Sequence, residues 1–317
     1  MGVAVVRVLF LGGLGRSGTT LLERVLGCLP GVCTLGEVVH LWRRDLIDDE
    51  RCGCGQAFSA CGFWHEVGER AFGGWHRLDP HHVLRLQSRV ERTRHIPRLA
   101  GRTRNDHARE YALYYARVYA AAAQVSGASV VVDSSKHASL AYCLRHAPNI
   151  DLRVAHVVRD ARGVAYSWTK TVTRPESDRR ETMTRYSPGR AALLWSAHNA
   201  AFGLLGARGV AVRRFRYEEF VADPRGVSRA VAAFAGLDLP SGALDFLAEG
   251  ADGSVHADLP PAHSAAGNPM RFRTGPVEVR ADESWRTALP PGQRRLVAAI
   301  AAPLHGAYGY PITGRRT

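Results

Sequence analysis

The chain has 317 residues, of which 46% are hydrophobic and 22% charged, a composition that excludes a disordered chain and allows a sizeable core. Its formal net charge of +13 favours anionic ligands, but the basic residues are spread along the chain and do not form the clustered tract of a nucleic-acid binder. No run reaches the roughly 20 apolar residues of a membrane span, and the N-terminus lacks the basic start of a signal peptide. We therefore expect a cytoplasmic protein with reduced cysteines, no nucleic-acid partner and no membrane span.

The first predicted elements are a buried strand over residues 3–11, a glycine loop and a helix. The loop and the helix start read "GLGRSGTT", in which Gly13 and Gly18 keep the G-x-x-x-x-G spacing of a phosphate-binding P-loop. Thr19 stands where such loops carry the lysine that reaches the β- and γ-phosphates of a nucleoside triphosphate. Backbone N–H groups at a helix N-terminus bind phosphate oxygens without that lysine. The loop therefore predicts a phosphate-bearing ligand that has no triphosphate chain.

Three cysteines and a histidine follow in the pattern C-x-C-x6-C-x3-H, formed by Cys52, Cys54, Cys61 and His65. Four such ligands could suit zinc, although the C-x-C pair is unusually short for a zinc site. A disulfide between two of the cysteines is a second interpretation, and small apolar residues in a loop are a third. We favour the third interpretation and expect no metal.

A long helix is predicted after residue 105, followed by further strands that alternate with helices. Apolar residues recur with helical spacing from Tyr111 to Ala122, with Asn105 or Asp106 as the N-cap and Gly127 at the end, and we expect the tyrosines to pack in the core. Strands are predicted at 129–136, 152–160 and 209–220. Strands alternating with helices predict a single-domain α/β fold over residues 1–317, with a doubly wound parallel sheet flanked by helices.

Polar residues gather where these predicted strands end. Ligands of doubly wound sheets bind beyond the carboxyl ends of the strands. The residues at those ends are the 13–20 loop, Asp133 to Lys136, Arg159 and Tyr217. Two segments, 169–190 and 250–285, have an irregular composition that suits mobile covers over such a site.

Two of these motifs resemble those of the sulfotransferases that use 3′-phosphoadenosine 5′-phosphosulfate (PAPS). "GRSGTTLL" is similar to their 5′-phosphosulfate loop, and "VVRDARGVAYSW" is similar to their 3′-phosphate motif, an arginine at a strand end followed eight residues later by a serine. Here these residues are Arg159 and Ser167, and a helix from about residue 160 would bring the serine back toward the strand end after about two turns. The resemblance covers residues 8–310 and implies a P-loop-like sulfotransferase fold, with variable acceptor-side insertions at about 50–105 and 169–190.

The same resemblance implies the residues that bind PAPS. "RYEEFVADP" is similar to a family segment whose tyrosine lies near the adenine, and "GNPMRFRTG" is similar to a late segment that closes over the 3′-phosphate. The implied donor-binding residues are Gly15, Arg16, Ser17, Gly18, Thr19, Thr20, Arg159, Ser167, Tyr217, Arg271, Arg273 and Gly275.

The base that takes the acceptor's proton has three candidates. Tyrosylprotein-type sulfotransferases place a glutamate in a "GE" pair after the loop helix, and Gly36-Glu37 stands at that distance here. Cytosolic small-molecule sulfotransferases use a histidine after a strand, which would be His137 in "DSSKH". We favour Glu37, with His137 and Asp133 as alternatives. Lys136 would stabilise the leaving phosphate, since lysine is otherwise found in this arginine-rich chain only at position 170.

The predicted activity is transfer of a sulfuryl group from PAPS, without a metal, to a hydroxyl of a small molecule or glycan. The basic 169–190 segment favours an acceptor with carboxylate or phosphate groups, and the arginine bias suggests a bacterium with secondary metabolism. A kinase-like P-loop phosphotransferase is an alternative, against which Thr19 argues. A non-enzymatic polyanion-binding module is another, and would bind all polyanions more weakly as salt rises.

Overall fold

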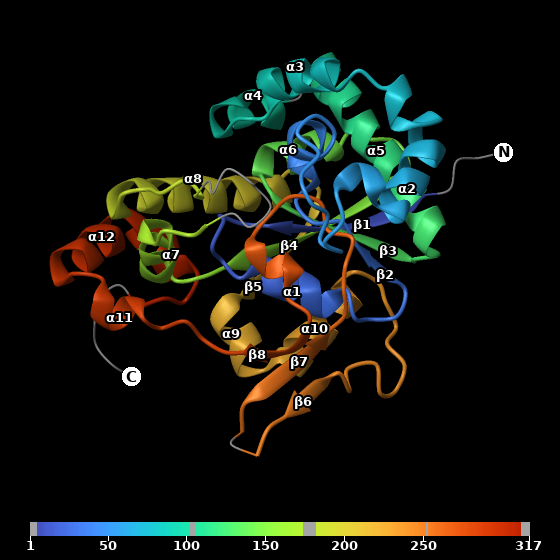
Figure 1. Cartoon of the computed structure of the whole chain (residues 1–317). Helices are drawn as coiled ribbons and strands as arrows, with labels where there is room; N and C mark the ends of the chain where they lie inside the picture. The colour runs from blue at the N-terminus through green and yellow to red at the C-terminus, as the bar shows by residue number, and fades with distance from the viewer. Residues whose placement is uncertain (1–4, 102–104, 174–181, 252, 312–317) are drawn as a thin grey trace.

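A five-stranded parallel sheet forms the centre of the chain (Figure 1). The computed structural model describes residues 5–101, 105–173, 182–251 and 253–311. The strands, in the spatial order β2-β3-β1-β4-β5, span Val6–Gly12 (β1), Val32–Thr34 (β2), Val130–Lys136 (β3), Ile150–Val158 (β4) and Ala211–Arg216 (β5). The predicted single-domain α/β fold with a parallel sheet is confirmed, although sequence reasoning did not find the short strand β2.

Helices cover both faces of the sheet (Figure 1). One face carries α2 (Gly62–Phe72), α3 (Pro80–Val90), α4 (Ile96–Ala100), α5 (Asp106–Ser126) and α6 (Ala138–Leu144). The opposite face carries α1 (Thr19–Leu26), α9 (Tyr217–Ala222) and α10 (Pro224–Phe234). Beyond the β4 end lie α7 (Ala161–Thr169), α11 (Trp285–Ala288) and α12 (Pro291–Ala307). Helix α8 (Pro188–Gly206) packs against α7 and α12 with its first half and against the α2–α6 side of the core with its second half. Among the described helices, none is both long and apolar enough to cross a membrane.

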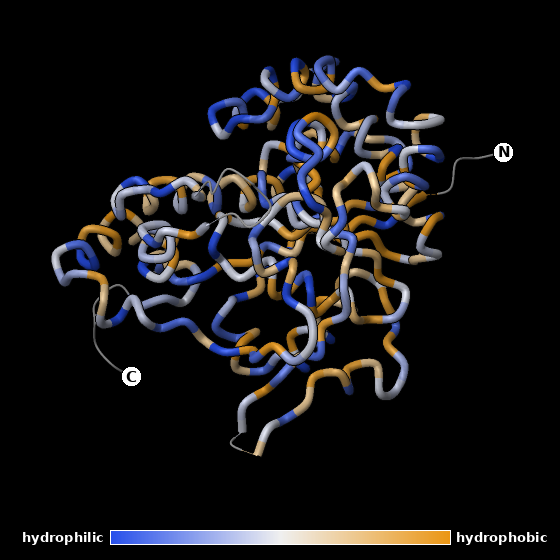
Figure 2. Tube along the Cα trace, in the orientation of Figure 1, coloured by the Kyte–Doolittle hydropathy of each residue, from blue (hydrophilic) through white to orange (hydrophobic). Residues whose placement is uncertain are grey.

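Alternation along the strands divides the core into two main layers. Val8 and Phe10 of β1 pack against the α2–α6 side, whereas Leu9 and Leu11 pack against α1 and α10. Successive strand residues point to opposite faces, so a strand buried on both faces must be apolar throughout. Figure 2 shows this as hydrophobic segments crossing the centre of the molecule beneath more hydrophilic outer helices.

Helix α5 confirms the predicted capping and the predicted role of its tyrosines. The Asn105 side chain accepts a hydrogen bond from the backbone N–H of Ala108, and Gly127 ends the helix in the left-handed conformation. Tyr111, Tyr115 and Tyr119 are fully buried. Each hydroxyl has a polar partner in the core, as buried tyrosines require.

A second, antiparallel sheet occupies part of the segment that was predicted to be irregular. Its strands are β6 (Leu247–Glu249), β7 (Val255–Leu259) and β8 (Gly275–Val279). The prediction of an irregular segment over residues 250–285 is therefore wrong at the positions of β7 and β8. The strands are short and alternate between buried and exposed positions, with Ala257, Leu259, Val277 and Val279 packed against the α1–α10 core. Gly, Pro and Ser in the connections hid this weak alternation.

The order of the strands creates one crevice at the carboxyl end of β1. From β1 the chain passes to β2 and β3 on one side and then to β4 and β5 on the other. A doubly wound sheet binds ligands where its strand order reverses in this way. All five strands run in the same direction, so the residues that follow them gather at that edge.

Candidate functional site

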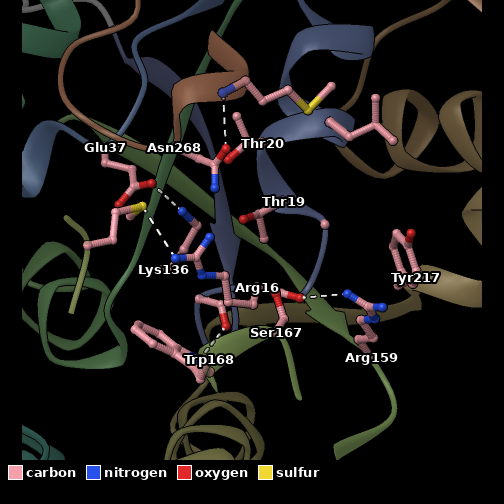
Figure 3. A pocket seen from close by; sticks show the side chains of 15 residues that line it. Arg16, Thr19, Thr20, Glu37, Lys136, Arg159, Ser167, Trp168, Tyr217 and Asn268 are labelled. Atoms are coloured by element: carbon pink, nitrogen blue, oxygen red, sulfur yellow. Dashed lines mark hydrogen bonds and ion pairs between the residues drawn. The ribbon is translucent and has the colours of Figure 1, made fainter. Parts of the chain in front are cut away.

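A cavity of about 280 Å³ lies at this edge of the sheet (Figure 3). Its volume is close to the lower limit for small-ligand sites. Segments far apart in the chain line it: Gly15, Arg16, Gly18, Thr19, Thr20, Leu21, Glu37, Lys136, Arg159, Ser167, Trp168, Met183, Tyr217, Asn268 and Met270. The structure thus brings together most, but not all, of the predicted site residues.

The glycine loop requires its two motif glycines for steric reasons. Gly13 has φ 139°, and a Cβ there would lie 2.4 Å from the carbonyl oxygen of Val157. Gly18 has φ 86°, and its Cβ would lie 2.4 Å from the ring of Tyr217. The loop can therefore pack against the end of β4 and the start of α9 only with glycine at both positions. It turns the first residues of α1, Thr19 and Thr20, toward the cavity.

The Arg16 side chain is held over the cavity by aromatic and sulfur contacts. Its guanidinium carbon lies 5.4 Å from the centre of the Trp168 ring, and Nη2 donates to Met183 Sδ at 3.3 Å. The indole N–H of Trp168 in turn donates to the carbonyl of Gly15 at 3.0 Å. Burial lowers the pKa of Arg16, and Glu37 partly offsets that effect. Among the described residues its contacts are not carboxylates, so its charge is available to an anion.

Arg159 and Ser167 line the same cavity, as their spacing predicted. Helix α7 begins directly after Arg159, with Asp160 as its N-cap, and returns Ser167 to the cavity wall. The Arg159 guanidinium lies over the Tyr217 ring, 4.6 Å from its centre, and makes a 3.6 Å ion pair with Asp282. Two hydrogen bonds to backbone carbonyls, of Arg16 and Asp282, fix it further. A buried arginine is thereby preorganised at a strand end.

Asp282 is a partner of this arginine that the sequence did not reveal. Its carboxylate also accepts from Lys170 Nζ at 3.1 Å. Burial acts to raise its pKa, but its bonds to Ser284 and Lys170 and the charge of Arg159 outweigh burial and lower the pKa to about 2. A permanently charged carboxylate therefore sits between two cations that could otherwise meet an anionic ligand.

Glu37 and Lys136 form an ion pair at the opposite wall of the cavity (Figure 3). Lys136 ends β3 with φ 67°, an uncommon conformation for lysine, and this conformation belongs to the turn that leaves the strand. Burial acts to raise the pKa of Glu37, but the charge of Lys136 and its hydrogen bond to the carboxylate outweigh burial and lower the pKa. Glu37 is therefore ionised at neutral pH.

Backbone and side-chain contacts hold Glu37 in place. Its N–H donates to the carbonyl of Ala266 at 3.1 Å, and the N–H of Gly36 donates to the buried carboxyl of Glu23 at 2.7 Å. His40 Nε2 lies 3.8 Å from the Glu37 carboxylate. Burial lowers the pKa of His40 to about 4, so it is neutral near pH 7. Sequence reasoning missed Glu23 and His40, since neither belongs to the recognised motifs.

The two alternative bases, His137 and Asp133, are not among the residues that line the cavity. His137 pairs through Nδ1 with the buried carboxylate of Glu91. Asp133 is fully buried, where it accepts from the Tyr119 hydroxyl at 2.5 Å and from the N–H of Ser135 at 2.7 Å. The geometry favours Glu37 as the carboxylate that faces the cavity.

The late segment reaches the cavity through Asn268 and Met270, but its three implied donor-binding residues, Arg271, Arg273 and Gly275, do not line the cavity. Arg271 is buried, and its guanidinium donates to the backbone carbonyls of Ala265 and Arg51 at 3.0 and 2.8 Å, which makes it a structural residue. Arg273 is exposed, and its carbonyl accepts from Arg24. Gly275 begins β8, and Ser17 is buried in the loop; neither lines the cavity.

The cavity wall also contains residues that were not assigned from the sequence. Asn268 caps a short 3₁₀ helix, Pro269–Phe272, and lines the cavity with Met270. Trp168 follows Ser167 directly, so the helical motif could have suggested it. Met183 belongs to the 169–190 segment, in which residues 174–181 lie outside the described part of the chain. The acceptor-side role of residues 50–105 and 169–190 remains a prediction.

Comparisons with known proteins bear on this geometry. A family model described as "Sulfotransferase family" matches residues 9–241. No curated protein sequence matches the chain. Among solved structures, the chain is similar to the sulfotransferase domain of the Synechococcus PCC 7002 olefin synthase, with 21% identity, 98% of each chain covered and a TM-score of 0.49.

Two further solved structures show weaker similarity. Sulfotransferase STF1 from Mycobacterium tuberculosis H37Rv has 18% identity over 77% of this chain and 71% of that chain, with a TM-score of 0.44. A sulfotransferase from Alicyclobacillus acidocaldarius has 16% identity over 98% of both chains, with a TM-score of 0.42.

Proposed function

The chain belongs to the sulfotransferase family, whose model matches well over half of its length, and we propose that it transfers a sulfuryl group from PAPS to a hydroxyl of a small molecule or glycan. One observation carries the proposal. A single cavity combines a lysine-free P-loop-like turn, two arginines and an ionised carboxylate paired with a lysine. These groups suit an anionic donor and a proton acceptor side by side.

The loop and α1 would bind the 5′-phosphosulfate. Free N–H groups at a helix N-terminus favour an anion, and the hydroxyls of Thr19 and Thr20 add donors on the same wall. Arg16 supplies a cation. Among the described residues, its guanidinium contacts the Trp168 ring and the Met183 thioether. A nucleoside triphosphate fits this wall less well, because Thr19 replaces the lysine of a P-loop.

Arg159 and Ser167 would hold the 3′-phosphate of the donor. A second cavity of about 110 Å³ shares Arg159 and Tyr217 with the first and also contacts Asp282. Two adjoining cavities that share a cationic side chain would suit a nucleotide that carries phosphates at both its 3′ and 5′ positions. Tyr217, which lines both cavities, would contact the nucleoside.

In the proposed reaction the acceptor oxygen attacks the sulfur atom while the sulfur–oxygen bond to the 5′-phosphate breaks. The acceptor proton passes to the Glu37 carboxylate, which the lowered pKa keeps ionised. The electron pair of the breaking bond stays on the 5′-phosphate of 3′-phosphoadenosine 5′-phosphate, where the ammonium of Lys136 offsets the added charge. The cations of Arg16 and Lys136 supply the positive charge that a metal ion supplies in phosphoryl transfer, so the step needs no metal.

The acceptor site would adjoin Glu37, between the 50–105 and 169–190 segments. His40, neutral at pH 7, and Met183 lie on that side. The basic character of residues 169–190 supports an acceptor that bears carboxylate or phosphate groups as well as the reacting hydroxyl.

Calorimetry with 3′-phosphoadenosine 5′-phosphate tests the donor assignment. We expect saturable binding, a raised melting temperature and weaker binding of ATP, which lacks a 3′-phosphate. Transfer of labelled sulfate from PAPS into a host extract, with mass detection of products that gain one sulfate, then identifies the acceptor. No binding at millimolar nucleotide would contradict the donor, and equal weakening of all polyanion binding by salt would favour a non-enzymatic module.

A further inference from the structure

Three thiols and one imidazole converge outside the cavity lining. Cys52, Cys54, Cys61 and His263 each offer a ligand atom, and these atoms all lie within 4.8 Å of one another. Cys54 Sγ lies 3.8 Å from Cys61 Sγ, and Cys61 Sγ lies 3.2 Å from His263 Nδ1. The cluster joins three segments, one of which is about 200 residues from the others in sequence.

The known distances between these atoms are close to the edges of a tetrahedral ligand set. Zinc–sulfur bonds of about 2.3 Å and zinc–nitrogen bonds of about 2.0–2.1 Å give tetrahedron edges of about 3.8 Å between sulfurs and about 3.6 Å between sulfur and nitrogen. A disulfide would instead place two sulfurs about 2.05 Å apart. All six cysteines are free. The cluster is therefore close to the shape that zinc requires.

Local hydrogen bonds build the cysteine side of the cluster. The N–H of Gly55 donates to the Cys52 carbonyl at 2.8 Å, and the N–H of Cys52 donates to the Gln56 carbonyl at 2.9 Å. This tight turn, with Gly55 at φ 91°, lets Cys52 and Cys54 present their thiols to one point despite their short spacing. Cys61 precedes helix α2 directly and completes the set of sulfurs.

The imidazole of His263 is fixed against the cluster although it is exposed. The Phe63 ring stacks on it at 5.1 Å and 15°, and the Trp64 indole N–H donates to the His263 carbonyl at 2.9 Å. The N–H of Gly53 donates to the carbonyl of Ser264 at 2.9 Å. Contacts on both sides of His263 thus hold its Nδ1 beside the thiols.

We propose that Cys52, Cys54, Cys61 and His263 bind a structural Zn²⁺ ion as three thiolates and one imidazole. Soft sulfur and nitrogen ligands in a tetrahedron select zinc, and four protein ligands leave no open position for substrate. Binding releases the thiol protons. The sequence pattern named His65 as the fourth residue and we expected no metal; His263 takes that place, while His65 is 64% exposed at its side chain.

The ion would fasten one wall of the cavity without contacting it. Two residues beyond His263, the N–H of Ala265 donates to the Leu35 carbonyl at 2.8 Å, and the carbonyl of Ala266 accepts from Glu37. Asn268 then lines the cavity. The zinc site would tie the 262–268 segment, which forms an isolated bridge between Ala265 and Gly36, to the 52–61 segment, and so hold the backbone that positions Glu37.

Metal analysis of the full chain, purified without chelator, tests the site directly. We expect one zinc per chain in the wild type and in His65→Ala, and at least a tenfold lower zinc content in His263→Ala and Cys61→Ser. Cys28→Ser is the matched cysteine control and should keep the zinc. Two results would overturn the assignment. One is a wild-type protein with less than about 0.1 zinc per chain, and the other is a zinc loss in His65→Ala as large as that in His263→Ala.

Cobalt substitution tests the ligand set without relying on a variant. Wild-type chain stripped by a chelator and reloaded with Co²⁺ should show intense visible bands of tetrahedral cobalt together with thiolate charge-transfer absorption. Removing zinc should lower the melting temperature by roughly 5–10 °C, and reloading should restore it. Weak octahedral cobalt bands, or a Cys54–Cys61 disulfide in mass spectra of unreduced peptides, would overturn the proposal. None of these measurements depends on sulfuryl transfer.

Discussion

Two walls of the same cavity are built in different ways. The loop wall consists of Gly15, Arg16 and residues 18–21 together with Arg159, Ser167 and Trp168, and it comes from two strand ends and the helices that follow them. The ion-pair wall, Glu37, Lys136, Asn268 and Met270, comes from three segments that meet only in the folded chain. The loop wall is fixed by local geometry, and the ion-pair wall depends on long-range contacts. Substitutions on the two walls should therefore change different quantities, the transfer rate on the ion-pair wall and the donor affinity on the loop wall.

The largest effect is expected on the ion-pair wall. Glu37→Gln should fold and bind 3′-phosphoadenosine 5′-phosphate, but transfer to an aliphatic alcohol should fall about 10²–10⁴-fold, because the amide keeps the shape and cannot take the proton. The defect should shrink for phenols of lower pKa. His137→Ala is the control, and steady-state transfer rates provide the measurement. A loss in His137→Ala with near-full activity in Glu37→Gln would make His137 the base.

On the loop wall the effect should fall on binding. Arg159→Ala should weaken the affinity for 3′-phosphoadenosine 5′-phosphate about 10–100-fold, since it removes a charged partner of a phosphate, while turnover at saturating PAPS changes less. Calorimetry and donor saturation curves separate the two quantities. Arg273→Ala, at an exposed position outside the cavity, should leave affinity within about twofold. An equal loss in Arg273→Ala would show that the late segment does close over the donor.

Glu23 joins the two walls and should make stability depend on pH. Burial raises its pKa from 4.5 to about 7, while its bonds to Ser134 and Gly36 oppose the shift. The folded chain then keeps a proton that the unfolded chain has lost, so this contribution is full below pH 4.5 and is lost as pH rises toward 7.

Glu23→Gln should remove that dependence. Between pH 5 and pH 8 the wild type should lose about 1–3 kcal/mol of unfolding free energy relative to the variant. Asp45 and Asp133, whose pKa values burial also raises, titrate in both proteins, so the difference isolates Glu23. Urea unfolding at pH 5, 6, 7 and 8 measures it. Parallel curves for the two proteins would contradict a protonated Glu23 in the folded chain.

The smallest expected effect concerns Asp282, which now pairs with Arg159 and Lys170. Its lowered pKa, about 2, means that no pH near neutrality releases these cations. Asp282→Asn should therefore raise the affinity for 3′-phosphoadenosine 5′-phosphate about 3–10-fold by removing a competing charge. Calorimetry at two salt concentrations checks it, because the gain should shrink at the higher one. A weaker affinity in Asp282→Asn would show that Asp282 positions the arginine instead.

Much of the loop wall could be predicted from the sequence. Each of the two motif spacings is set by one local unit of strand, turn and helix. These are the spacing of Gly13 and Gly18 and that of Arg159 and Ser167. Such geometry depends on neighbours along the chain, so a single sequence displays it. The parallel sheet was predictable for the same reason, because continuous apolar strands alternate with helices.

The tertiary structure decided which other residues reach the site. Glu37 faces the cavity because β2, too short to recognise, sets the chain beside β3, whereas His137 turns to Glu91. Arg271 points to backbone carbonyls rather than to the donor wall. His263, not His65, completes the cysteine cluster. The sequence did not indicate this, because His263 is far from the cysteines along the chain. Local spacing determines local geometry, and contacts between distant segments arise only when the core packs them together.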